Sequence, residues 1–97
     1  MSRIERLEYH QAQLMKFLGL LRSENYQPMP GAAVMSFQMI IDDAIQDGLT
    51  SNELLLVLTE FDLDILNKHD ILDAYPSLPN QIRRHDFQET SPSLPLN

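Results

Sequence analysis

The 97-residue sequence contains no cysteine and no tryptophan, and it has only three glycines. Without cysteine there is no disulfide, no thiolate zinc site and no cysteine nucleophile, so we expect a cytoplasmic protein. A Gly-rich phosphate-binding loop with its lysine is also missing. No apolar run approaches the roughly 18 residues that a membrane span needs, and the early acidic residue Glu5 argues against a signal peptide.

Basic residues are also scarce, with seven Lys and Arg against fourteen Asp and Glu and a net charge of −7. The segment 25–79 holds nine of the acids and a single basic residue, Lys68. Phosphate backbones are bound by clustered Lys and Arg, so we expect no direct nucleic-acid binding. The acids either keep a solvated surface soluble or attract a basic partner surface. The acids expected to form a rim around a binding surface are Asp42, Asp43, Asp47, Glu60, Asp62 and Asp64.

Apolar residues at three- and four-residue spacing predict a first helix over residues 3–22. Ser2 and Glu5 have the spacing of a capping box, in which each side chain satisfies an otherwise unpaired backbone N–H. A linker with two prolines then stops the helix, because proline cannot continue it. The same apolar spacing predicts a second helix over residues 32–47.

A third helix is predicted over residues 51–67, opened by a second capping box formed by Thr50 and Glu53. The run 54–58 is entirely aliphatic and covers the whole circumference of a helix. A strand is the competing interpretation of such a run, but the helical cap before it favours a helix.

The sequence therefore predicts an all-α domain in residues 1–87, built as a small bundle of three main helices and one or two short C-terminal helices. Residues 88–97 have little to bury and are expected to form a disordered tail.

Motifs that carry chemistry are weak in this sequence. Ala44, Gly48 and Thr50 resemble the corner of a helix-turn-helix motif, but acidic or aliphatic residues follow where base-reading side chains should stand. We therefore interpret them as the corner of a helical hairpin. His69 with Asp70 and Asp73, helped by Asp62 or Asp64, could at most bind a divalent ion weakly. No nucleophile motif appears, and the paired carboxylates are ordinary for an acidic helix surface. We expect no enzymatic activity, no cofactor, no metal site and no small-molecule substrate.

The apolar surface is larger than three helices can hide from one another in so short a chain. Large exposed apolar patches in soluble proteins mark interaction sites, and methionine is common where a surface must adapt to its partner. We expect another protein, a second copy of the chain in a dimer, or both to cover this surface. The residues expected to bind the partner are Met15, Phe17, Leu20, Met35, Met39, Leu55 and Leu56.

Composition and pattern together favour a small acidic regulatory or adaptor protein without catalysis, of the inhibitor, antiactivator or chaperone type. The first alternative is an acidic mimic of nucleic acid that blocks a DNA- or RNA-binding protein, and a weak metal-dependent enzyme is a further alternative. Salt separates the first two, because mimicry weakens steeply between low and moderate salt whereas apolar docking does not.

Overall fold

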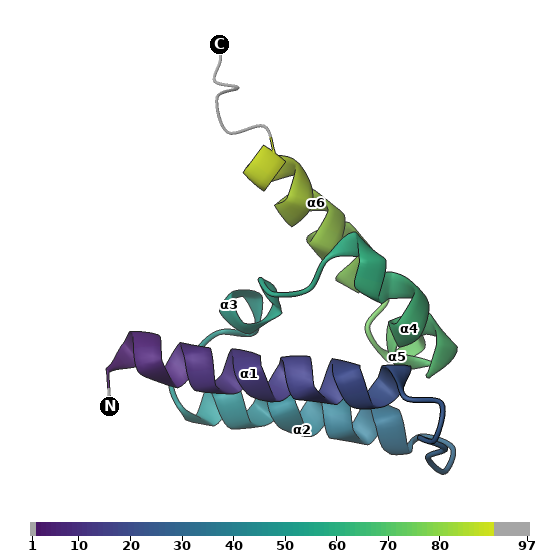
Figure 1. The fold of residues 1–97 in the computed structure, drawn as a ribbon. Helices are drawn as coiled ribbons and strands as arrows, with labels where there is room; N and C mark the ends of the chain where they lie inside the picture. Colours follow the sequence, from purple (N-terminus) through teal and green to yellow (C-terminus); the bar gives the residue numbers. More distant parts are fainter. Residues whose placement is uncertain (1, 91–97) are drawn as a thin grey trace.

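The computed structural model describes residues 2–90 of the chain, with side chains for residues 2–84. Two long helices, α1 (Arg3–Arg22) and α2 (Ala32–Gln46), lie side by side and run antiparallel (Figure 1). The shorter elements are α3 (Ser51–Leu55), the 3-10 turn η1 (Glu60–Asp62), α4 (Leu63–Lys68), α5 (Ile71–Ala74) and α6 (Leu78–Thr90). The all-α prediction is confirmed. None of the helices in the described residues is long and apolar enough to cross a membrane.

Local capping sets the starts of α1 and α3. The Ser2 hydroxyl accepts the Glu5 N–H at 3.1 Å and the Glu5 carboxylate accepts the Ser2 N–H at 2.9 Å. Thr50 and Glu53 repeat this reciprocal pair, at 3.1 and 2.9 Å, at the start of α3. Both capping boxes lie where the sequence predicts them.

A glycine sets the C-terminal end of α2. Gly48 has φ +88°, a left-handed conformation that favours glycine, and directly follows the C-cap. The next N–H, that of Leu49, donates at 3.0 Å to the Ala44 carbonyl, which also accepts the Asp47 N–H at 3.1 Å, so the turn pairs a carbonyl of the last helical turn. The side chain of Leu49 is buried. This corner therefore turns the chain from α2 into α3.

The predicted continuous helix over 51–67 is wrong, because α3 stops at Leu55 and the next helical turn begins only at Glu60. The Asp62 carboxylate accepts the Thr59 N–H at 2.7 Å and forms an ion pair with Arg22. A continuous helix would direct the Thr59 N–H to the carbonyl four residues earlier instead. The break is therefore a third local cap, which directly follows the aliphatic run 54–58 that suggests one helix.

Two C-terminal helices follow, as predicted, but α6 extends to Thr90 and so passes the expected boundary at residue 88. The remainder of the predicted tail, residues 91–97, lies outside the described residues. Figure 1 shows α6 leaving α5 and running across from α3, so that the two helices face each other over a gap.

The core lies between α1 and α2 and beneath the short helices. The Phe37 ring packs against Phe17, with ring centres 6.4 Å apart, and edge-on against Tyr75 at 5.1 Å. Leu14 and Leu18 of α1 are fully buried in the same cluster. The remaining core residues come from every helix and include Leu21, Ile41, Leu54, Leu58, Leu66, Ile71, Leu78 and Ile82.

We predict that Phe37→Ala lowers the free energy of unfolding by about 3–5 kcal/mol, because it leaves a cavity at the centre of the core. Phe61→Ala is the matched control, since this ring is 92% exposed and its loss should change the free energy by less than about 0.5 kcal/mol. Urea unfolding followed by circular dichroism measures both. Equal losses for the two variants would contradict the placement of the core.

Candidate functional site

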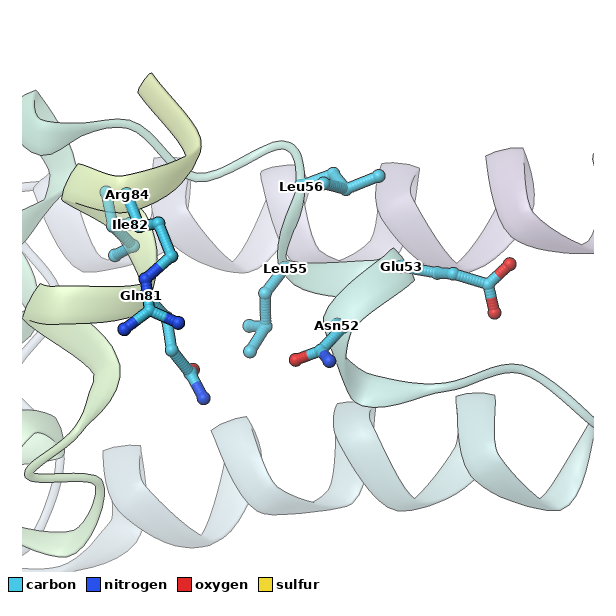
Figure 2. Close-up of a pocket in the computed structure, with 7 residues that line it drawn as sticks. All are labelled: Asn52, Glu53, Leu55, Leu56, Gln81, Ile82 and Arg84. Carbon is cyan, nitrogen blue, oxygen red and sulfur yellow. The ribbon is translucent and has the colours of Figure 1, made fainter. Parts of the chain in front are cut away.

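A hollow of about 320 Å³ lies between α3 and α6. In Figure 2, Asn52 and Leu55 of α3 face Gln81 and Arg84 of α6 across it. The full lining is Asn52, Glu53, Leu55, Leu56, Gln81, Ile82 and Arg84.

A second hollow, of about 270 Å³, adjoins the first and shares Leu55 and Gln81 with it. It reaches from α3 to α2 and to the start of α6. We call the two hollows together the groove. The other residues lining the second hollow are Gln38, Ile41, Asp42, Ile45, Ser51, Tyr75, Ser77 and Leu78.

Polar contacts hold the walls of the groove in place. The Gln11 side chain of α1 donates to the Glu53 carbonyl at 3.2 Å, which ties α3 to α1. On the opposite wall, Arg83 Nε donates to Glu60 Oε1 at 3.0 Å and joins α6 to η1. The buried Ile82 anchors α6 on its inner side. The two walls of the groove, α3 and α6, are therefore held by different contacts: α3 by α1, and α6 by η1.

The charged group of the α3 wall is held ionised. Arg3 forms a bidentate ion pair with Glu53, with one N–O distance of 2.7 Å. This pair, with the Thr50 N–H, lowers the pKa of Glu53 from its usual 4.5 to about 2. Burial, and to a lesser extent the charge of Asp42, raises the pKa of Tyr75. Neither group is therefore suited to exchange a proton near neutral pH.

The predicted partner-binding residues do not form one patch. Leu55 and Leu56 line the groove, whereas Met35 and Met39 lie on an exposed side of α2. Met15 and Leu20 of α1 are both exposed, but they point in different directions. They are five positions apart, and at 100° per residue this separates them by about 140° around the helix.

Phe17 needs a correction. Its side chain is only 7% exposed and packs against Phe37, so it belongs to the core and not to a binding surface. The reason is its position on the helix: Phe17 precedes the buried Leu18 and lies one turn from Leu14 and Leu21, on the side of α1 that meets α2.

The predicted acidic rim is not continuous either. Asp42 lines the groove, and Asp43 and Asp64 are exposed elsewhere. The other three acids have partners within the fold. Asp47 lies 2.9 Å from the buried His10, Glu60 pairs with Arg83, and Asp62, only 5% exposed, pairs with Arg22. Including Asp62 in an exposed rim is therefore wrong.

Sequence reasoning missed most of the groove. Ile45 falls on the apolar spacing that predicts the second helix, which suggests a core position, yet it is 50% exposed and lines the second hollow. Gln81 and Arg84 of α6, and Tyr75 directly after α5, gave no signal, because no periodicity reveals the position of the short C-terminal helices. Only the packing of α6 opposite α3 brings these residues together.

The weak metal site suggested by His69 and Asp70 finds no support. Within the described part of the chain, no three His, Asp or Glu side chains gather as metal ligands do. His69 Nε2 instead lies 3.3 Å from the Leu21 carbonyl, and its ring packs on Tyr26. His69 therefore connects the end of α4 to the end of α1.

Comparison of the chain with protein-family models, curated proteins and solved structures finds no match.

We predict that Glu53→Gln makes stability less sensitive to acid. A carboxylate whose pKa is lowered by folding stabilises the fold above its unfolded pKa, and this contribution is lost as the pH falls toward the folded pKa. For Glu53 the loss runs from pH 4.5 down to about 2. Urea unfolding at several pH values in this window measures it. If the free energy of unfolding falls equally with pH in the variant and in the original chain, the lowered pKa of Glu53 is contradicted.

Proposed function

We propose that the chain is a small non-catalytic adaptor or regulatory protein that binds a segment of another protein in the groove. The observation that carries this proposal is an apolar groove left partly open to solvent. Ile45 is 50% exposed and Leu56 is 40% exposed, whereas Leu54 and Leu58 of the same aliphatic run are buried. Leu56 lines the first hollow and Ile45 the second, and Leu55 lines both. A concave apolar surface of this kind is the usual form of a binding site.

The energetics support binding. Full burial of one Leu or Ile side chain contributes about 1.5–3 kcal/mol. A partner segment that covers Ile45, Leu55 and Leu56, and adds apolar side chains of its own, would offset a substantial part of the translational and rotational freedom lost on association. The amide and hydroxyl groups around the apolar floor supply the polar rim that interfaces require.

The chemistry of the groove supports a non-catalytic role. Its titratable groups among the described side chains are Asp42, Glu53, Tyr75 and Arg84. Glu53 stays ionised and Tyr75 stays protonated near neutral pH, as their shifted pKa values require. Neither acts readily as a general acid or base there.

The pattern of charges gives less support to a nucleic-acid mimic, because several acids already have partners within the fold. Asp47, Glu53, Glu60 and Asp62 all contact cationic or histidine side chains. A mimic needs its carboxylates turned toward the blocked protein.

The absence of cysteine is consistent with the reducing cytoplasm as the place of action.

We predict that Ile45→Lys abolishes partner binding while Met35→Lys leaves it intact. Both substitutions put a charge on an exposed apolar position of α2, but only Ile45 lines the groove. The two variants and the original chain serve as baits for affinity capture from the organism that encodes the protein. The proteins that each bait recovers are then compared.

Circular dichroism of each bait confirms that it is folded. A partner that is retained by Ile45→Lys but lost with Met35→Lys would move the binding surface to the outer side of α2. Light scattering of the purified chain tests whether a second copy fills the groove.

A further inference from the structure

We propose that the groove binds an extended peptide segment, and that Asp42 and Arg84 fix its direction by pairing with a basic residue at one end and an acidic residue at the other. This inference rests on the proposed function and specifies the chemistry of the partner. It is carried by the shape of the groove, by the amide groups on its walls and by the opposite charges in its two hollows.

The shape favours a segment that places side chains in two successive hollows. The hollows measure about 270 and 320 Å³ and meet at Leu55 and Gln81. Both are floored by aliphatic side chains, such as Ile45 in one and Ile82 in the other. A strand projects every second side chain to the same face, so two such side chains could enter the hollows on either side of Leu55.

The walls favour an extended backbone over a helix. Gln38, Asn52 and Gln81 line the groove from α2, α3 and α6, and each carboxamide offers both donors and an acceptor. An extended segment presents unpaired N–H and C=O groups that match these amides. In the interior of a helix the backbone N–H and C=O groups pair with one another, so they cannot also pair with these amides.

The two hollows carry opposite charges. Asp42 lines the hollow next to α2, and Arg84 lines the hollow next to the outer part of α6. Glu53 shares the hollow of Arg84, but Arg3 neutralises it. Among the side chains that the structure describes, neither Asp42 nor Arg84 takes part in an ion pair. A segment with a cation over Asp42 and an anion over Arg84 complements both hollows.

The same charges point to another protein as the source of the segment. Residues 91–97, which follow α6, contain no basic side chain that could pair with Asp42. A second copy of the chain remains an outcome of the test and not the proposed occupant.

The test is selection of a phage-displayed library of random 12-residue peptides on the full chain. Three immobilised baits are compared: the original chain, Ile45→Lys, and the double variant Asp42→Lys with Arg84→Glu. We expect the original chain to enrich peptides, relative to Ile45→Lys, that have apolar residues at alternate positions between one basic and one acidic flank. The double variant should enrich peptides with the order of these flanks reversed.

The affinity of a synthetic peptide with the enriched sequence then measures how much each charge contributes to binding. Single reversal of Asp42 or Arg84 should weaken its affinity about two- to fivefold, as expected for one solvent-exposed ion pair. Swapping the charged flanks of the peptide should restore the affinity for the double variant.

Several outcomes would overturn the inference. Apolar residues at three- and four-residue spacing would show a helical occupant, and an unchanged flank order with the double variant would show that the charges do not set direction. Both results leave the proposed function standing. If no peptide is enriched over Ile45→Lys, the inference fails, and the capture experiment decides separately whether the groove binds a protein. Dimerisation that Ile45→Lys removes would assign the groove to a second copy.

Discussion

The buried carboxylate of Asp62 is the constraint from which the shape of this molecule follows. A buried carboxylate needs compensating partners, and here the Thr59 N–H at 2.7 Å and the guanidinium of Arg22 supply them. The N–H of Thr59 is available only because the helix has already ended at Leu55. Asp62 therefore both interrupts the third helical segment and fastens its second part to the end of α1.

This interruption accounts for the groove. Because α3 stops early, Leu58 turns into the core while Leu55 stays partly exposed and Leu56 stays exposed. The chain resumes in η1, and Glu60 of η1 holds Arg83 of α6 at 3.0 Å. The helix that forms the far wall is thus tied to the segment that follows the break. An uninterrupted helix over the same residues would alter both walls at once.

Local signals explain how much of this could be predicted from the sequence. The boundaries of α1 and the start of α3 follow from capping boxes and apolar spacing, which act within a few residues. Thr59 and Asp62 have the same three-residue spacing as those boxes, but the preceding aliphatic run made a continuous helix the simpler interpretation. The deciding partner, Arg22, is forty positions away in the sequence, and such tertiary contacts have no local pattern. For the same reason the groove was anticipated only through Leu55, Leu56 and Asp42, and its α6 wall was not.

Backbone chemical shifts of residues 50–70, measured by nuclear magnetic resonance on the full chain, test this account most directly. Cα shifts report helical conformation residue by residue and do not depend on any ligand. The account predicts helical shifts for α3 and again from η1 through α4, with a clear interruption between them that includes the extended Thr59. Unbroken helical shifts from residue 51 to residue 67 would show that the helix does not break, and the groove as described would not exist.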